Sequence, residues 1–387
     1  MVILPIGSGK GGVGKSLLAT NLSIALAEKG RRVILADLDL GASNAHTMLG
    51  IRSVSRGIGT FLSVPRMKFE EIVLSTEYEG LSFIPGDAEV PGIANLKAAQ
   101  KSRLTRCLGA LQADYLVLDL GPGAGVNALD FFLLSASGIV VTTPALTAIL
   151  NAYLFLKNVV FRLMYATVDK GSAALGVLEE MRRVPGGLQK AYVPRIMEKI
   201  GAEDPASHAK LSGVLDRLKP RLVLNMLEDP ADADKMERLR RSAREYLGIE
   251  LAHLGVIYRD ELQNVALGSR IPIVRYKPGS VLSRAVYRIA DKIAAAPLVA
   301  AGSAQWPAAA SDAETDDAGF QTAETEAESD FQAMRRDLED LLHSGALTTG
   351  DLVEAVRTQQ LELASLRKEN ALLRARAVRA AREGARV

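Results

Sequence analysis

A glycine-rich loop near the amino terminus is the strongest chemical signal in this chain of 387 residues. Residues 9–16 read Gly-Lys-Gly-Gly-Val-Gly-Lys-Ser and satisfy the pattern G-x-x-x-x-G-K-[ST]. The loop follows a short apolar run, 2–6, and precedes a segment, 17–29, with apolar residues at helical spacing. Glycines let backbone N–H groups surround a phosphate, and the start of a helix adds partial positive charge. The pattern predicts a phosphate-binding loop in which Lys15 contacts the β- and γ-phosphates and the Ser16 hydroxyl ligates Mg²⁺.

A second pattern overlaps this loop. Gly7, Gly9 and Gly12 also fit the G-x-G-x-x-G fingerprint of dinucleotide-binding folds. Asp37 then ends the second predicted strand, where a ribose-binding acid would lie. A dehydrogenase has no need of the lysine–serine pair that ends the loop, so the phosphate-loop interpretation is favoured.

The composition excludes several other classes of protein. Lys plus Arg total 47 and Asp plus Glu total 45, and the net charge of +2 argues against a histone-like nucleic-acid binder. The single cysteine, Cys107, can form no internal disulfide and no cysteine-pair metal site. The first residues lack the basic region of a signal peptide, so we expect a reducing, cytoplasmic setting.

Short apolar runs alternate with helical patterns through most of the chain. Strands are predicted at 2–6, 32–37, 81–85, 114–119, 139–143, 221–225 and 254–257. Continuous β-branched runs separated by helices predict an α/β fold with a doubly wound, mostly parallel sheet. Ligands of such sheets bind beyond the carboxyl ends of the strands. Pro5 breaks the pattern, because proline is disfavoured inside a central strand, and the sequence offers no explanation.

An uncharged stretch between Asp130 and Lys157 has the apolar character of a membrane span. It also contains many polar residues and Pro144, so a buried strand, a turn and a helix are favoured. A segment at about 165–220 then reads as helical and carries several basic residues. A solvated helical insertion is the favoured interpretation, and a surface for a partner or a nucleic acid is the alternative.

The composition changes near Pro297, where the predicted main domain, 1–297, ends. Residues 298–328 are rich in Ala, Ser, Thr, Asp and Glu, which predicts an acidic disordered linker. Residues 329–387 are predicted to be helical, with mostly apolar heptad positions and Asn370 at one a position, typical of a two-stranded coiled coil. A membrane-surface helix, favoured by the five arginines between 374 and 386, and a bare solvated helix are the alternatives.

Several of these motifs together resemble the MinD/ParA ATPases, which are P-loop NTPases. Residues 10–16 are similar to the deviant Walker A motif of that family, including its additional early lysine. Residues 37–41 resemble the family's second motif, and residues 115–123 resemble its Walker B motif and switch II. Residues from 129 to 153 look most like the FlhG/FleN branch, the MinD-like regulators of flagellar number. The resemblance covers about residues 1–295.

The resemblance implies three catalytic residues. Lys15 neutralises phosphate charge, and Lys10 is the signature lysine that reaches the nucleotide of a partner subunit. Asp39 positions the attacking water. A lysine given in trans is physically coherent, because phosphoryl transfer needs mainly positioning and charge neutralisation.

The resemblance also implies the residues that hold the cofactors, ATP and Mg²⁺. Ser16, Asp37 and Asp119 would form the metal site and its water shell, and Asn225 would face adenine. For the two aspartates the alternative is a carboxylate that caps the next turn, and for Asn225 it is a simple turn residue. The implied nucleotide-binding set is Gly9, Gly11, Gly12, Val13, Gly14, Lys15, Ser16, Leu17 and Asn225.

The function implied is that of a cytoplasmic ATPase whose two copies join face to face on ATP and separate on hydrolysis, which controls the position or number of a structure such as a flagellum or division site. An activating or cargo protein would be a partner, weak peripheral membrane contact is allowed, and DNA is not excluded. The alternative is a non-hydrolysing, nucleotide-gated scaffold that acts through the C-terminal helices. Two departures stand out: the cysteine pair of iron–sulfur relatives is absent, and Tyr-Arg-Asp at 258–260 replaces a frequent proline.

Overall fold

The computed structural model describes residues 1–86, 95–183, 191–295 and 317–343, together with residues 350, 357 and 360. The chain divides into two units, Met1–Asp330 and Phe331–Val387. The sheet and the candidate site both lie in the first unit.

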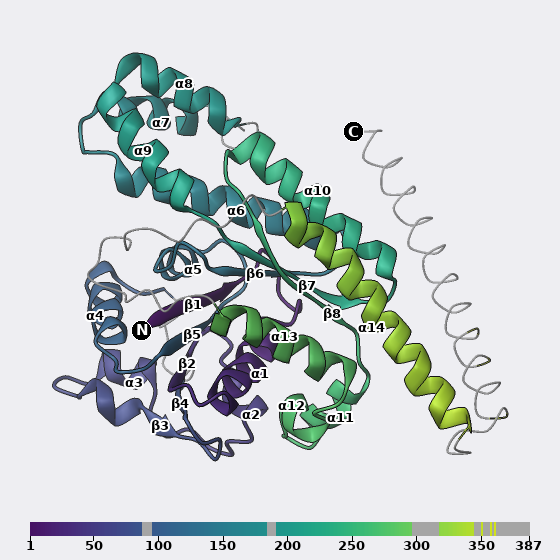
Figure 1. Ribbon diagram of the computed structural model, residues 1–387. Helices are drawn as coiled ribbons and strands as arrows, with labels where there is room; N and C mark the ends of the chain where they lie inside the picture. Colours follow the sequence, from purple (N-terminus) through teal and green to yellow (C-terminus); the bar gives the residue numbers. More distant parts are fainter. Residues whose placement is uncertain are drawn as a thin grey trace, which may run out of the picture. The chain divides into compact units, whose positions relative to one another are not determined.

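A mostly parallel sheet forms the centre of the first unit (Figure 1). Within the described residues its strands are β1 (Val2–Gly7), β2 (Val33–Leu38), β3 (Leu74–Ser75), β4 (Leu81–Ile84), β5 (Tyr115–Leu120), β6 (Ile139–Thr142), β7 (Arg221–Leu227) and β8 (Ala252–Tyr258). Their order is β3-β4-β2-β5-β1-β6-β7-β8, and only the β3–β4 pair is antiparallel. The doubly wound sheet expected from the apolar runs is confirmed. The two-residue strand β3 was not predicted, because it is too short to leave a pattern.

Helices alternate with these strands along the chain. They are α1 (Lys15–Glu28), α2 (Ala45–Met48), α3 (Ile58–Ser63), α4 (Ala98–Gly109), α5 (Val126–Phe132), α6 (Leu146–Thr167), α7 (Ala173–Arg183), α8 (Val193–Glu203), α9 (Pro205–Arg217), α10 (Asp234–Ser242), α11 (Leu262–Gly268), α12 (Ile273–Tyr276), α13 (Val281–Ala295) and α14 (Asp317–His343). A single-turn π-helix, Ala243–Leu247, continues α10. The segment expected to form a helical insertion, 165–220, contains α7, α8 and α9.

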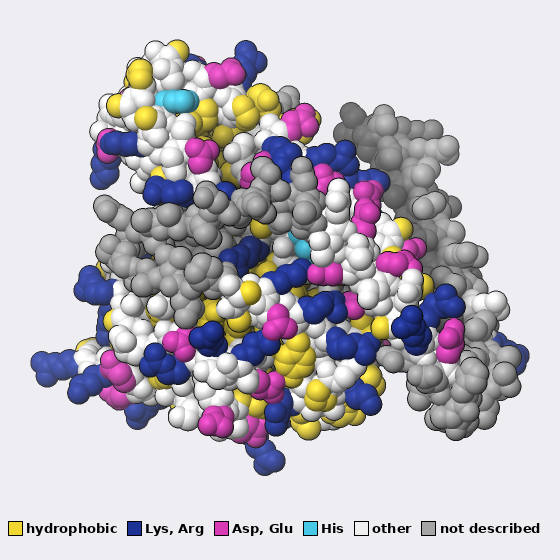
Figure 2. Space-filling model, in the orientation of Figure 1, with side chains coloured by type: hydrophobic (Ala, Val, Ile, Leu, Met, Phe, Trp, Pro, Cys, Tyr) yellow, Lys and Arg dark blue, Asp and Glu magenta, His cyan; other side chains and the backbone are white. Residues whose placement is uncertain are grey.

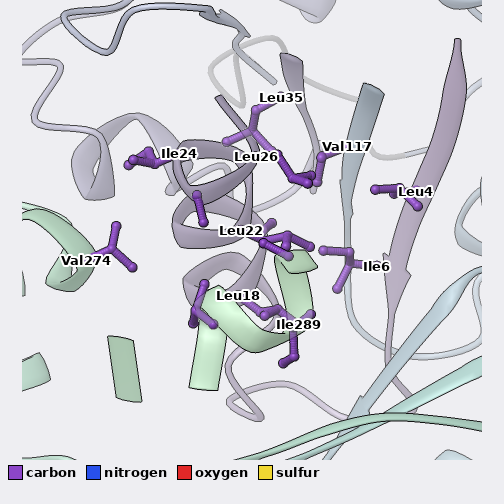
Figure 3. Close-up of a cluster of buried hydrophobic side chains, with 14 of the residues drawn as sticks. Leu4, Ile6, Leu18, Leu22, Ile24, Leu26, Leu35, Val117, Val274 and Ile289 are labelled. Carbon is purple, nitrogen blue, oxygen red and sulfur yellow. The ribbon is translucent and has the colours of Figure 1, made fainter. Parts of the chain in front are cut away.

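Helix α1 is buried on nearly all sides between the sheet and α12–α13. Leu18 and Leu22 of α1 lie against Ile6 of β1, with Val274 and Ile289 of α12 and α13 on the other side (Figure 3). Each fully buried leucine of this kind contributes roughly 1.5–3 kcal/mol to stability. The packing therefore holds the first turn of α1 rigidly beyond the end of β1.

Pro5 is tolerated in the central strand β1 for a reason that the register supplies. The N–H of Val2 donates to Asp114 next to β5, and successive residues of a parallel strand face alternate neighbours, so the nitrogen of Pro5 faces β6. Pairing of β1 with β6 begins only at Ile6. Pro5 therefore precedes the first residue of β1 that pairs with β6, and its missing N–H costs no hydrogen bond between these strands.

Helix α6 is the one described helix that is long and apolar enough to cross a membrane by length and composition. Half of its most apolar window is buried inside the protein. The stretch after Asp130 forms the end of α5, strand β6 and the first part of α6.

The carboxyl-terminal segment differs from the sequence-based expectation. Residues 317–328, expected to belong to a disordered linker, are helical and form the first half of α14. Their alanines, Ala323 and Ala327, are buried, and acidic side chains of the same face pair with basic groups of β8 and α13. Composition alone predicted disorder because it does not reveal the ion pairs that this helix makes with groups remote in the sequence.

The predicted coiled coil lies mostly outside the described residues. Its polar a position, Asn370, and the leucines around it belong to the part of the chain that the structure does not describe. The coiled coil therefore stays a prediction.

Candidate nucleotide-binding site

The loop between β1 and α1 has a backbone shape that glycine makes possible. Gly12 and Gly14 have φ of 77° and 92°, in the left-handed region that disfavours side chains. A Cβ on Gly9 would come within 1.8 Å of the carbonyl oxygen of Asn151 in α6. The Ser8 hydroxyl donates to the carbonyl of Lys10 at 2.7 Å. Residues 9–16 thus form a tight turn that ends at the amino terminus of α1, as the sequence pattern predicts for a phosphate-binding loop.

Lys15 is a buried cation at the first position of α1, only 6% exposed. Burial lowers the pKa of Lys15, while the charges of Asp119 and Asp39 act to raise it. No hydrogen bond of its ammonium group is found within the described residues. A lysine so placed, at a helix amino terminus, suits an anion with several oxygens.

Asp119, in the carboxyl-terminal half of β5, lies beside Lys15 and Ser16. Burial raises the pKa of Asp119, Asp37 on the neighbouring strand raises it further, and a hydrogen bond from Ser16 acts against both. Asp37 and Asp119 are register partners on β2 and β5. The Oδ1 atom of Asp119 is buried without a hydrogen-bond partner.

These residues fit the oxygen donors that Mg²⁺ prefers. Ser16 offers a hydroxyl and Asp119 an unpartnered carboxylate oxygen, and a divalent cation would stabilise the charged form of the two adjacent acids. In the described parts of the chain no three His, Cys, Asp or Glu side chains gather tightly enough to hold a metal alone. Phosphate oxygens and water would have to complete such a site.

Asp37 holds the loop that follows β2. Its Oδ1 accepts a hydrogen bond from the Asp39 N–H at 3.0 Å, and its Oδ2 accepts from the Ser43 hydroxyl at 2.7 Å and the Ala45 N–H at 3.2 Å. Burial raises the pKa of Asp37, and these three hydrogen bonds act to lower it. This geometry corresponds to the alternative of a turn-capping carboxylate, and the role of Asp37 in the metal's water shell stays a prediction.

Asp39 is half-buried and lies against the loop that follows β5. Its Oδ1 would be 3.1 Å from a Cβ on Gly121, so glycine leaves the room that this carboxylate occupies. The Gly123 N–H donates to the Ser8 carbonyl at 2.9 Å, which joins the same loop to the glycine-rich loop. The structure therefore brings Asp39, Lys15 and Asp119 into one region at the carboxyl edge of the sheet. Sequence reasoning did not assign roles to Gly121, Gly123 or Ser8.

Lys10 is exposed and stands apart from the buried acids. Its Nζ lies 3.5 Å from the hydroxyl of Thr147 in the first turn of α6, at the outer limit of a hydrogen bond. The side chain therefore borders solvent at the mouth of the loop and is held only weakly by its own chain.

Asn225 reaches the glycine-rich loop from β7, 212 residues later in the sequence. Its side chain is buried, and Nδ2 donates to the carbonyl of Val13 at 2.9 Å. A Cβ on Gly14 would lie 2.1 Å from that nitrogen. The adenine contact implied by resemblance stays a prediction, and the observed contact is with the loop itself.

The strand around Asn225 is irregular. Pairing of β7 with β8 shifts register between Leu224 and Leu227, and Met226 has a φ of 59°. Such bulges re-aim side chains next to functional sites. The irregularity turns Asn225 toward the loop, and no sequence signal distinguished Met226.

Comparisons with known proteins agree with this geometry. Residues 1–185 match the ParA family model, described as "NUBPL iron-transfer P-loop NTPase". Antiactivator FleN of Pseudomonas aeruginosa is 25% identical over 300 residues, which cover 77% of this chain and 88% of FleN. Flagellum site-determining protein YlxH of Helicobacter pylori is 33% identical over 156 residues, which cover 40% of this chain and only 52% of YlxH.

The fold has solved counterparts. The septum site-determining protein MinD of Pyrococcus horikoshii, in complex with Mg-ADP, superposes with a TM-score of 0.51 at 21% identity. The superposition covers 76% of this chain and 95% of that protein. Residues 1–185, just under half of the chain, are therefore similar to the ParA family of P-loop NTPases, and the chain has the fold of the MinD structure.

Proposed function

We propose that this protein binds ATP with Mg²⁺ at residues 9–16 and hydrolyses it. The observation that carries the proposal is the buried ammonium of Lys15 at the start of α1, next to Ser16 and to Asp119, whose Oδ1 has no hydrogen-bond partner. A cation at a helix amino terminus suits the phosphates of a nucleotide, and the hydroxyl and carboxylate oxygens beside it suit the Mg²⁺ that accompanies them.

Each residue of the site has a proposed part in the reaction. Mg²⁺ would neutralise charge on the transferred phosphate. Asp119 fixes the Ser16 hydroxyl, and Asp37 fixes the backbone N–H of Asp39. Asp39 then accepts a hydrogen bond from the attacking water and orients it.

Lys10 supports a second proposal, that two copies join face to face on ATP. Among the described residues, its exposed side chain has one hydrogen bond, the long contact to Thr147, so little is lost when it leaves its own chain. In the dimer it would contact the phosphates of the partner subunit's nucleotide, as an arginine finger does. Hydrolysis and release of the γ-phosphate would remove the negative charge that Lys10 contacts in the partner subunit, and the two copies would separate.

The proposed role is to control the position or the number of a cellular structure. YlxH and MinD, named as flagellum site-determining and septum site-determining proteins, support this part of the proposal. Iron transfer is disfavoured, because a cysteine-bound cluster needs several thiolates and the sequence has only Cys107. We propose a cytoplasmic protein with an activating or cargo partner and, through the arginine-rich end of the chain, weak contact with membrane or DNA.

The first experiment tests nucleotide binding. Lys15→Ala should abolish binding of a fluorescent ATP analogue in the presence of Mg²⁺, because the phosphates lose their main cation. Lys170→Ala, which removes an exposed lysine outside the site, is the matched control and should bind normally. Unchanged affinity in Lys15→Ala would overturn the assignment of the loop.

The second experiment separates hydrolysis from scaffolding and tests Lys10 in trans. Lys10→Ala and Asp39→Ala should each bind ATP but release little phosphate. A mixture of the two should regain part of the activity, because a mixed dimer has one site with an intact Asp39 and a Lys10 donated by the other copy. If Lys10 acts within its own chain, the mixture stays inactive. If the unaltered protein binds ATP and never releases phosphate, with or without a partner, the scaffold alternative is favoured.

A further inference from the structure

The first half of α14 contacts β8 and α13 through acidic side chains, and two alanines of this half are buried. Ala323 and Ala327 are 1% and 0% exposed and face inward, and Asp330 is buried one turn later. Small side chains let the helix lie close to β8, the edge strand of the sheet. Figure 2 shows basic and acidic side chains interleaved on the outer surface of the molecule in the orientation of Figure 1.

Ionic groups make most of the specific contacts in this docking. Glu326 receives hydrogen bonds from Lys292 of α13 at 2.6 Å and from His253 of β8 at 3.2 Å. Asp330 binds both terminal nitrogens of Arg288, a bidentate arrangement. The acceptor surface is thus basic and the docked face acidic, so matched charges hold the two together.

A hydroxyl at the end of β8 also contacts the docked helix, next to the strand β7 that carries Asn225. Tyr258 ends β8, and its hydroxyl donates to the Ala327 carbonyl at 2.8 Å. Tyr258 pairs in register with Leu227 of β7, and the Arg259 N–H donates to the Leu227 carbonyl. Leu227 stands two residues after Asn225, whose amide holds the glycine-rich loop.

We propose that the acidic half of α14 is a detachable ligand of the β8–α13 surface, and that its docking pre-organises the nucleotide loop. The proposal rests on the proposed ATP site. The docked helix fixes Tyr258, Tyr258 fixes the ends of β8 and β7, and these hold the amide of Asn225 on Val13. Because coupling between two sites is reciprocal, nucleotide binding also strengthens the docking of α14.

Detachment is compatible with a folded main domain. The core between the sheet, α1 and α13 consists of apolar residues that do not involve α14. The ion pairs of Glu326 and Asp330 can exchange protein partners for water, and Ala323 and Ala327 each bury only a methyl group. The acidic half of α14 can therefore dock and undock while the main domain stays folded. Its docking and the conformation of the nucleotide loop influence each other.

A charge-reversal pair on α14 tests the proposal in the full-length chain. Glu326→Lys places a cation against Lys292 and His253 and should undock the helix. Glu324→Lys makes the same change on the exposed face of the same helix and is the matched control. Hydrogen exchange followed by mass spectrometry would monitor peptides over 317–330, 225–227 and 9–16, with 115–120 of β5 as the folding reference.

In Glu326→Lys we expect exchange about tenfold faster over 317–330, and faster exchange over 225–227 and 9–16 even without nucleotide. Affinity for a fluorescent ATP analogue should fall at least about fivefold. Glu324→Lys should match the unaltered protein in all of these. Tyr258→Phe, which removes only the hydroxyl, should change the same peptides in the same direction by less, and it replaces Glu326→Lys if that variant also exposes β5.

Each contrary outcome has its own meaning. Faster exchange confined to 317–330 would overturn the coupling, and no change there would overturn the docking contacts. An unaltered protein that binds no nucleotide would overturn the proposed function instead, and the nucleotide-free exchange would still decide whether α14 acts on the loop.

Discussion

The glycine-rich loop and the docked half of α14 are built on opposite principles. The loop is specified by eight consecutive residues whose glycines permit a backbone that other residues could not adopt. The docked helix is specified by His253, Arg288 and Lys292, which lie 34 to 73 residues away from their acidic partners. Steric rules act locally and leave a pattern in the sequence, whereas charge matching across a fold leaves none. Substitutions should therefore disrupt the loop through steric clashes and the docked helix through loss of charge pairing.

The largest expected effect is steric and lies in the loop. Gly9→Ala should lower the free energy of unfolding by about 3 kcal/mol and abolish nucleotide binding, because its Cβ would meet the Asn151 carbonyl, a backbone atom that cannot move aside. Gly11→Ala is the control, since its Cβ would meet only Pro122 at 3.8 Å. Urea denaturation and titration with a fluorescent ATP analogue measure both. Equal tolerance of the two substitutions would contradict the observed packing of α6 on the loop.

A smaller effect is expected where a distant residue supports the loop. Asn225→Ala should cost about 2 kcal/mol, because the buried Val13 carbonyl loses its donor. Binding of tripolyphosphate, which has no base, should weaken together with binding of ATP. If only ATP binding weakens, Asn225 acts through adenine and not through the loop.

The sequence predicted the parts of the site that depend on local pattern. Seven of the strands and the glycine-rich turn before α1 followed from apolar runs and glycine spacing, and the structure places Lys15, Asp39 and Asp119 in one region. The hydrogen bond of Asn225 to Val13 and the contacts of Asp37 with Ser43 and Ala45 could not be predicted, since they depend on a register shift and a loop conformation. The helix at 317–328 was missed because its stability comes from a surface that composition does not reveal.

Acid should weaken the docked helix and leave the loop's steric constraints unchanged. Burial acts to raise the pKa of Glu326, but hydrogen bonds and charge from His253 and Lys292 outweigh it and lower the pKa to about 2. A carboxylate with a lowered pKa contributes stability above its unfolded pKa of roughly 4.3, and this contribution is lost as pH falls through about 2. Arg288 and Asp330 complete the charged groups at this contact.

The measurement is the urea midpoint of the unaltered protein and of Glu326→Gln between pH 7 and pH 2. At pH 7 the unaltered protein should be more stable by about 1.5 kcal/mol, after allowance for solvent screening. This difference in the free energy of unfolding should shrink as pH falls below about 4.5 and disappear near pH 2. A constant difference across this range would mean that the carboxylate charge does not hold the helix.

The smallest effect concerns Met226, which lies between the two regions. Its φ of 59° disfavours any side chain, so Met226→Gly should raise stability by roughly 0.5 kcal/mol, the relief of strain less the greater entropy of unfolded glycine. Arg66→Gly is the control, because Arg66 has a φ of 65° in an exposed turn away from the site and should gain about as much.

The two glycine substitutions should differ in function although they agree in stability. The methyl group of Met226 would be 3.9 Å from a Cβ on Gly14, so this side chain covers the loop that Asn225 holds. Removing it frees the strand end to relax, and a strained residue that is kept at a binding site usually serves pre-organisation. Met226→Gly should therefore bind the ATP analogue more weakly than Arg66→Gly, by about twofold to fivefold, while both unfold at higher urea concentrations. Equal affinities would show that the strain at Met226 is a by-product of the register shift, and that the hydrogen bond from Asn225 alone positions the loop.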